Sequence, residues 1–190
     1  MMHTMDPKQL SPSARSVFQK IEFDEDEKLL FEVRKHWFGL FLIYLTGSFI
    51  IFVLLIAAVG VVLAPGVDFR SVGLPLLSIS VLLALLGSII TAIAAYLYKS
   101  NVIIVTSDKL AQLLMQGLFH QKISQLSIGD VQDVTVRQHG IFPHMFHYGT
   151  VVIETAGEQQ NYTFTYAPDP YECAKAIVNS HEENLKLHGN

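Results

Sequence analysis

The sequence predicts an α+β membrane protein, in which a two-helix transmembrane hairpin precedes a small antiparallel β-rich domain that a C-terminal helix closes. Two long uncharged apolar stretches predict the hairpin. Alternating apolar and polar residues after position 99 predict the strands, and a capping pattern around position 169 predicts the last helix.

The composition agrees with a chain that is partly embedded in lipid. Only 16% of the residues are charged and 51% are hydrophobic, whereas soluble domains carry about 25% charged residues. The missing charge is concentrated in the two apolar stretches. The formal net charge of −4 and the absence of a clustered basic face argue against nucleic acid as a partner.

Residues 1–36 form the first segment, which we expect on the cytoplasmic side. Up to Lys28, this segment contains Pro7, Pro12, several Ser residues and an acidic run at residues 24–27. Such a composition favours a mobile tail. A short helix over residues 13–21 is the alternative.

Two spans follow, at residues 37–63 and 72–98, joined by an extracytoplasmic loop at residues 64–71. Each span is about 27 residues long in this sequence, and roughly 20 suffice to cross the hydrocarbon core. A cleaved signal peptide is a poor alternative for the first span, because the acidic run precedes it and the stretch is too long.

Basic residues near the spans set the expected orientation, because Lys and Arg are retained on the cytoplasmic side. The loop between the spans has only Arg70, whereas the flanks carry Lys20, Lys28, Arg34, Lys35, Lys99 and Lys109. We therefore expect a multi-pass protein of the cytoplasmic membrane with both termini in the cytoplasm.

The second span has small residues at every fourth position, namely Ser80, Ala84, Ser88 and Ala92. Such a stripe allows close helix–helix packing in lipid, either with the first span or with a second copy of the chain. Neither span contains Asp, Glu, Lys, Arg or His, so an ion path through the hairpin is not expected.

The predicted cytoplasmic domain covers residues 99–187, with a tail at 188–190. Alternation and turn residues predict strands at residues 101–106, 110–116, 119–124, 131–138, 149–155 and 161–166, with a hairpin turn at 157–160. Asp169 as N-cap, Pro170 at the first helical position and Glu172 three residues after the cap predict the start of the final helix.

Several segments occur together in an order that resembles the bacterial PH-like membrane protein family. They are residues 27–37, 106–110, 128–136 and 146–157, with Gly117 in a turn between them. The resemblance covers roughly residues 22–180. It implies a PH-like fold, a bent antiparallel β-barrel or sheet capped by a C-terminal helix, at the cytoplasmic face of the membrane. It implies no catalysis.

Three histidines, His139, His144 and His147, lie close together in one predicted loop. Their spacing matches no zinc motif, and a site would need convergent geometry and usually a fourth ligand. Metal binding is therefore only a weak alternative to a loop whose apolar residues pack inward or touch the bilayer. We expect no cofactor, no metal and no catalytic site, because no nucleophile elbow, phosphate loop or carboxylate pair appears.

Specific phosphoinositide binding is also not expected. Recognition of the phosphates would need several Lys or Arg residues in the first hairpin of the domain. That hairpin offers only Lys109, preceded by Ser107 and Asp108.

Two functions remain open. In the first, the chain is a membrane-anchored, non-catalytic PH-like interaction or scaffold module, whose partners are the lipid bilayer and either another protein or a second copy of itself. In the second, it is a small accessory subunit of a membrane transport or enzyme complex, and the hairpin is the contact surface.

Overall fold

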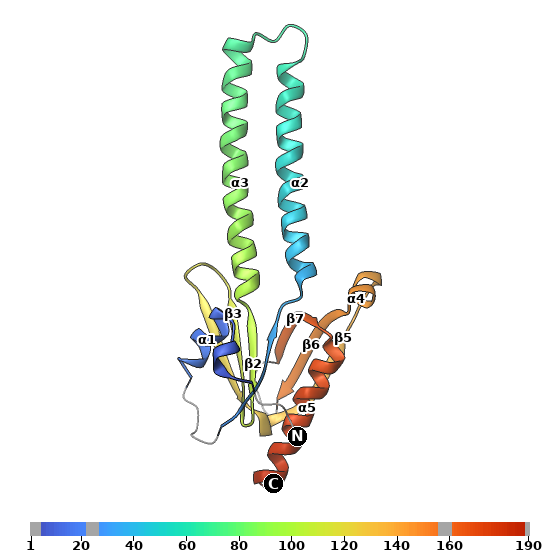
Figure 1. Ribbon diagram of the computed structural model, residues 1–190. Helices are drawn as coiled ribbons and strands as arrows, with labels where there is room; N and C mark the ends of the chain where they lie inside the picture. The colour runs from blue at the N-terminus through green and yellow to red at the C-terminus, as the bar shows by residue number, and fades with distance from the viewer. Residues whose placement is uncertain (1–4, 22–26, 156–160, 189–190) are drawn as a thin grey trace. The chain divides into compact units, whose positions relative to one another are not determined.

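The computed structural model describes residues 5–21, 27–155 and 161–188 (Figure 1). The chain divides into two compact units. The first, which we call the domain, combines Met1–Phe38 with Leu97–Asn190. The second, which we call the hairpin, is Gly39–Tyr96 and is inserted into the sequence of the domain.

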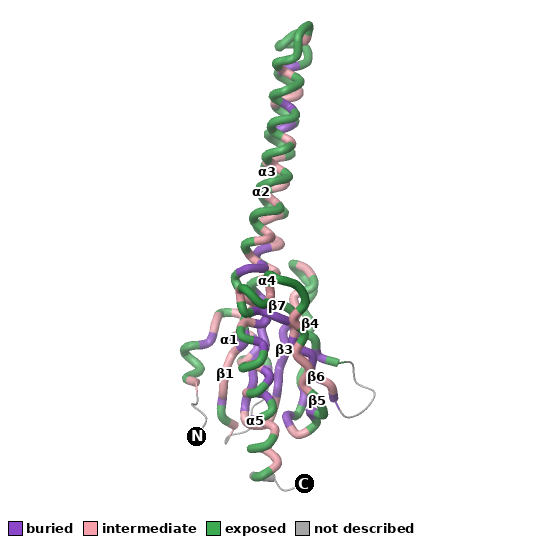
Figure 2. Tube along the Cα trace, turned by 90° about the vertical axis from the view of Figure 1, so that its right-hand side faces the viewer, coloured by how far each residue is buried: buried purple, intermediate pink, exposed green. Residues whose placement is uncertain are grey.

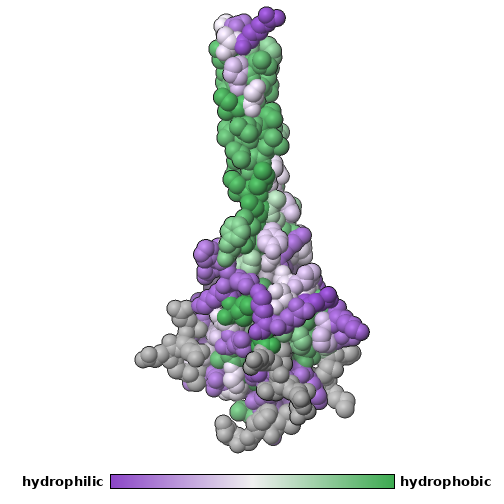
Figure 3. Space-filling view, turned by 90° about the vertical axis from the view of Figure 1, so that its left-hand side faces the viewer, coloured by the Kyte–Doolittle hydropathy of each residue, from purple (hydrophilic) through white to green (hydrophobic). Residues whose placement is uncertain are grey.

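The hairpin consists of the long helices α2 (Trp37–Val62) and α3 (Leu74–Ser100). The first two residues of α2 and the last four of α3 belong to the domain. A π-helical turn at Phe69–Gly73 precedes α3, and the Asp68 carboxylate accepts a hydrogen bond of 2.9 Å from the Ser71 amide there. Both helices are long and apolar enough to cross a membrane. Their surface is hydrophobic (Figure 3) and largely exposed (Figure 2).

Small residues bring the two helices of the hairpin together. A Cβ atom added at Gly47 would lie 2.7 Å from Thr91 Cγ2, and one added at Gly87 would lie 3.3 Å from Ile51 Cγ1. The helix backbones therefore approach closely at these two points, as small residues allow in membrane helices.

The structure uses only part of the small-residue stripe of α3 for this packing. Ser80 is 3% exposed and Ala84 is half-buried, whereas Ser88 and Ala92 are exposed. Four residues exceed one turn of 3.6, so a row of every fourth residue drifts around the helix and leaves the contact. Gly87 and Thr91, which lie beside the stripe, continue the contact in place of Ser88 and Ala92.

The domain contains two antiparallel sheets (Figure 1). The four-stranded sheet has the order β1 (Leu29–Arg34), β2 (Val102–Thr106), β3 (Lys109–Met115), β4 (Gln121–Ser127). The three-stranded sheet has the order β5 (Val131–Arg137), β6 (Tyr148–Thr155), β7 (Tyr162–Pro168). A short 3₁₀ turn, Ile128–Asp130, joins β4 to β5, and the short helix α4 (Ile141–Phe146) joins β5 to β6.

The predicted strands of the domain are confirmed as β2 to β7, with bounds that differ by at most three residues. The final helix is confirmed as α5 (Pro170–His188), which begins directly after Asp169. The Cys173 amide donates to the Asp169 carbonyl at 3.0 Å in its first turn. The predicted turn at residues 157–160 lies outside the described residues.

The expectation of a mobile tail up to Lys28 is wrong for residues 5–21, and residues 29–34 also belong to the domain rather than to a segment outside it. Strand β1 pairs along β2, with Val33 opposite Ile103 and Arg34 opposite Val102. Helix α1 (Pro12–Phe18), which follows a 3₁₀ turn at Pro7–Gln9, agrees with the alternative of a short helix. The physical reason is burial, because β1 supplies apolar side chains to both faces of the sheet.

Two apolar clusters hold the domain together. The larger lies between the two sheets and α5, and its centre includes Ile103, Leu110, Ile153, Phe164 and Ile177. The smaller lies between the other face of the four-stranded sheet and α1, where Val17 packs near Ile104. The four-stranded sheet is therefore covered on both faces, and its strand β2 is buried along its whole length.

Candidate functional site

The most distinctive group of side chains in the domain is a cluster of aromatic rings beside the points where the chain leaves for the hairpin and returns from it. We call it the aromatic cluster. It comprises His36, Trp37, Phe38, Tyr98, Phe142, Phe146, Tyr148 and Tyr166. His36 directly precedes α2, and the other members come from the first turn of α2, the end of α3, helix α4 and strands β6 and β7.

Phe38 is the centre of the aromatic cluster. Its ring stacks on Phe146 at a centroid distance of 4.6 Å, on Tyr148 at 5.3 Å and on Phe142 at 5.7 Å. Trp37 meets the edge of Phe146 at 5.6 Å. Aromatic pairs in these arrangements stabilise a structure beyond the area they bury, so α4 is held directly against the first turn of α2.

Polar contacts connect the same rings to the backbone. The Tyr98 hydroxyl donates to the His36 carbonyl at 2.7 Å, and the His36 amide donates to the Tyr166 carbonyl at 2.6 Å. The Lys35 ammonium lies 5.1 Å from the centroid of the Tyr98 ring, a cation–π distance.

Burial shifts the pKa values of ionisable groups in and beside the aromatic cluster. Desolvation lowers the pKa of Lys35. It also lowers the pKa of His36, against an opposing effect of the Asp169 carboxylate. Burial raises the pKa of Tyr148, with a further contribution from Tyr166.

Helix α4 owes its conformation to the residues at its two ends. Gly140 precedes it with φ 98°, and His147 ends it in the left-handed region with φ 54°. The Gln138 amide donates to the Tyr148 carbonyl at 2.9 Å and closes the loop beneath the helix. This bracing leaves Ile141, Phe142 and Met145 exposed by 80%, 56% and 55%.

The histidines that suggested a weak metal alternative lie around α4, and His139, His144 and His147 are all exposed. Within residues 5–21, 27–155 and 161–188, no three His, Cys, Asp or Glu side chains converge in a way that could hold a metal ion. The structure therefore does not bring the three histidines together as ligands.

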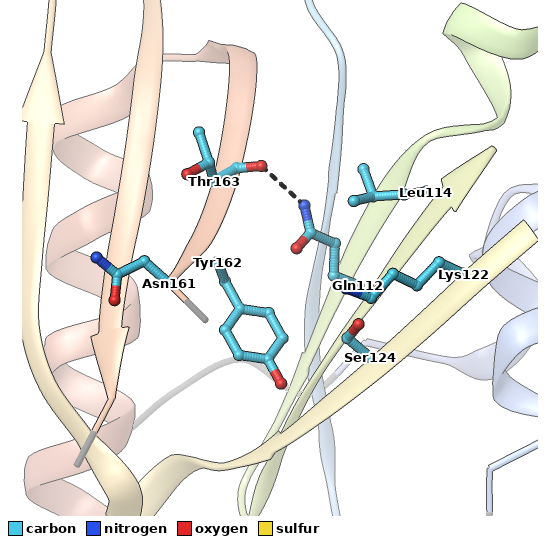
Figure 4. Close-up of a pocket in the computed structure, with 7 residues that line it drawn as sticks. All are labelled: Gln112, Leu114, Lys122, Ser124, Asn161, Tyr162 and Thr163. Atoms are coloured by element: carbon cyan, nitrogen blue, oxygen red, sulfur yellow. Dashed lines mark hydrogen bonds between the residues drawn. The ribbon is translucent and has the colours of Figure 1, made fainter. Parts of the chain in front are cut away.

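A second feature is an open groove of about 360 Å³ between β3, β4 and β7 (Figure 4). The Gln112 amide crosses it and donates to the Thr163 carbonyl at 3.0 Å, while the Tyr162 hydroxyl donates to the Gln125 carbonyl at 2.8 Å. The groove is lined by Gln112, Leu114, Lys122, Ser124, Asn161, Tyr162 and Thr163. Its two buried polar side chains thus already have partners within the domain.

The turn between β2 and β3 is engaged in internal contacts. Lys109 Nζ lies 3.3 Å from Glu27 Oε2, and the Glu27 side chain is fully buried. Thr106 Oγ1 also bonds to the Glu27 carboxylate. The Asn184 amide of α5 donates to the Ser107 carbonyl at 3.0 Å and to the Asp108 carboxylate at 2.8 Å. The Lys109 charge is therefore balanced within the domain.

Sequence reasoning identified the histidine-containing loop but missed the aromatic cluster. The available signal was the pair of aromatic residues at the domain-side ends of the predicted spans, Trp37 and Tyr98. Trp37 contacts Phe146 of α4, and Tyr98 contacts Tyr166 of β7. Both contacts depend on the fold of the second sheet, and alternation within single strands does not reveal them.

Comparison with protein families finds a match to the bacterial PH domain family over residues 38–179, well over half of the chain. The matched segment includes both apolar helices and strands β2 to β7, whereas β1 precedes it. Comparison with curated proteins finds no match.

Among solved structures, the chain is similar to a DUF1696 family protein with a pleckstrin-homology domain from Shewanella loihica PV-4. The two sequences are 18% identical, and the match covers 43% of this chain and 70% of that chain with a TM-score of 0.34. The family match rests on most of the chain, including both apolar helices. The chain belongs to the bacterial PH domain family.

Proposed function

We propose that this protein is a membrane-anchored interaction module, in which the hairpin spans the cytoplasmic membrane twice and the PH-like domain, with both termini, lies in the cytoplasm. The proposed activity is non-catalytic binding. One observation carries the proposal: two long, apolar, exposed helices are inserted between the first two strands of a PH-like domain.

The pairing of β1 with β2 supports a double crossing. Strand β1 ends three residues before α2 begins, and β2 begins two residues after α3 ends. Because the strands are neighbours in one sheet, the chain must return to the side from which it left. Two spans satisfy this requirement. The basic residues that flank the spans on the side of the domain favour a cytoplasmic location for the domain.

The proposal is tested by cysteine labelling in intact cells with a membrane-impermeant maleimide. Ala64, in the loop between the helices, and Glu183, on α5, are both exposed. Ala64→Cys and Glu183→Cys are each introduced alone, in a chain in which Cys173 is replaced by alanine. We expect rapid labelling at position 64 in intact cells, and labelling at position 183 only after the cells are opened. The reverse pattern would contradict the orientation, and release of the protein from membranes by alkaline carbonate would contradict the anchor.

Specific phosphoinositide binding is not part of the proposal. The basic side chain of the first hairpin after α3, Lys109, is paired with a buried carboxylate, and Asp108 adds a negative charge to the same turn. Phosphate recognition needs several unpaired cationic donors. The expected outcome is that purified protein in vesicles shows no preference for phosphoinositides over other anionic lipids of equal charge.

The second candidate is an accessory subunit of a membrane complex. It is favoured by the part of the small-residue stripe of α3 that the intrachain contact leaves exposed, Ser88 and Ala92. Photo-crosslinking from position 88 in native membranes separates the candidates. Crosslinks to one defined membrane protein would support the subunit, and crosslinks only to lipid or to a second copy would exclude it.

A further inference from the structure

We propose that two loops of the domain, α4 and the β3–β4 turn, insert their apolar side chains into the interfacial region of the lipid bilayer. This inference rests on the proposed function, because it presupposes that the hairpin spans the membrane. It adds a second mode of attachment, which would fix the orientation of the domain against the lipid surface.

The first loop is defined by its contacts with the start of α2. Phe142 and Phe146 stack on Phe38, and Trp37 meets the edge of Phe146. Trp37 is nevertheless 56% exposed, as is Phe142, and Ile141 is 80% exposed. If α2 enters the bilayer at its first turn, the exposed face of α4 lies at the same depth as Trp37, a residue type enriched at the membrane interface.

The second loop is placed by the register of the four-stranded sheet. Leu113 lies opposite Val102, and the Met115 amide donates to the Asn101 side chain at 2.6 Å. The turn after Met115 therefore lies at the end of the sheet where the chain returns from α3. Its tip carries Leu118, 47% exposed, and Phe119, 93% exposed.

Both loops thus lie at one end of the domain, as the ribbon and tube views show (Figures 1 and 2). An almost fully exposed Phe beside a turn Leu is unusual for a surface that faces water only. Insertion of such side chains into the headgroup and upper acyl region would remove them from water.

The charges of the two loops fit a lipid surface. Residues 116–122 and 137–147 contain no Asp or Glu, and they carry Lys122, Arg137 and four of the histidines. Asp169, whose amide donates to the His147 carbonyl, directly precedes α5, and Glu172 lies in the first turn of α5. Cationic side chains close to a membrane are attracted by anionic headgroups, so an anionic lipid surface is favoured over a basic protein partner at this end.

The test uses the full chain, with Cys173 replaced by alanine, in vesicles of phosphatidylcholine and phosphatidylglycerol in equal amounts. An environment-sensitive fluorophore is attached to a cysteine introduced at position 119 or 145, and quenching by lipids brominated along their chains is measured. Val53→Cys on the exposed surface of α2 reports whether the hairpin is in the bilayer. Glu183→Cys, near the opposite end of the domain, is the matched exposed control.

We expect the labels at positions 119 and 145 to show blue-shifted emission and several-fold more quenching than the label at position 183. If the label at position 53 is quenched but the labels at positions 119 and 145 are quenched as little as the label at position 183, this inference is overturned. The membrane anchor is then still supported by the quenching at position 53. Quenching at only one of the two loops would overturn the proposal for the other. Absence of quenching at 53 would overturn the anchor and the inference together.

Discussion

At the scale of single residues, a buried ion pair joins two parts of the domain that are far apart in sequence. Glu27 precedes β1, and Lys109 begins β3, after the hairpin in sequence. The Glu27 side chain is completely buried while that of Lys109 is 29% exposed. A buried carboxylate without its cation is strongly unfavourable, so this pair helps to join the N-terminal strand to the rest of the domain.

Replacing the cation tests this contribution. Lys109→Met should lower the free energy of unfolding by about 3 kcal/mol, because it removes the cation that faces the buried Glu27 carboxylate. Lys175→Met, at an exposed position of α5, is the matched control. It should change the free energy of unfolding by no more than about 0.5 kcal/mol. Chemical denaturation of the detergent-solubilised chain measures both, and equal stability of the two variants would refute the assignment.

A second residue-scale prediction concerns the start of β6. A Cβ atom at Gly149 would lie 2.9 Å from Gln138 Cγ and 2.9 Å from Pro170 Cγ. Gly149→Ala should therefore destabilise the domain by about 1–3 kcal/mol through overpacking, as measured by the same denaturation. Gly117→Ala has open space around it and should be close to neutral. A neutral Gly149→Ala variant would mean that β6 and α5 pack more loosely at this junction.

The single cysteine gives a third prediction. Burial raises the pKa of Cys173 to about 11, so the unreactive thiol form predominates at neutral pH. We expect native protein to react slowly with maleimide at pH 7, faster as the pH rises toward the raised pKa, and rapidly at pH 7 once unfolded in detergent and urea. Mass spectrometry follows the reaction, and rapid labelling of the native chain at pH 7 would contradict the burial.

At the scale of secondary-structure elements, α1 acts as a cover for the outer face of the four-stranded sheet. Ala14 and Val17 are buried against it, with exposed fractions of 0% and 1%. The Glu32 carboxylate of β1 accepts a hydrogen bond of 2.9 Å from the Ser11 amide at the start of the helix. Residues 5–21 are therefore part of the folded domain.

Detaching α1 should expose that face. Val17→Asp places a charge in the smaller apolar cluster and should make residues 5–21 rapidly cleavable by protease. Gln19→Asp introduces the same charge at an exposed position of the same segment and should leave the cleavage rate unchanged. Equal protection of both variants would show that α1 does not depend on this burial.

At the scale of the whole molecule, the sequence predicted the hairpin helices, strands β2 to β7 and α5, because each has a strong local pattern. It did not predict β1. Leu29 and Val33 are buried, the three residues between them are half-buried and Arg34 is exposed, so the strand has no clean alternation. Their partner strand comes only after the hairpin, so no local turn signalled the pairing.

The aromatic cluster and α4 were beyond sequence reasoning for a related reason. Helix α4 has six residues, includes Pro143 and depends on the positive φ of Gly140, so no periodic pattern marks it. The histidine spacing in the same segment attracted attention instead. Phe142 and Phe146, which lie beside those histidines, are the residues that stack on Phe38 at the start of α2.

The central claim is that the hairpin divides a single PH-like domain and returns the chain to the same side of the membrane. Val33 and Ile103 lie opposite each other on β1 and β2 and share one apolar cluster. Directly opposed residues of antiparallel strands are within disulfide reach, whereas residues offset by two positions are about 7–8 Å apart. The pair Val33→Cys with Ile103→Cys therefore reports on the pairing across the hairpin.

The decisive measurement is oxidative crosslinking of this pair in carbonate-washed membranes, with Cys173 replaced by alanine. We predict a rapid intramolecular disulfide between positions 33 and 103, and a much slower one when the second cysteine replaces Val105 instead. Failure of the opposed pair to form a disulfide in membrane-bound protein would contradict the central claim, because residues 33 and 103 would then not be neighbours in one sheet.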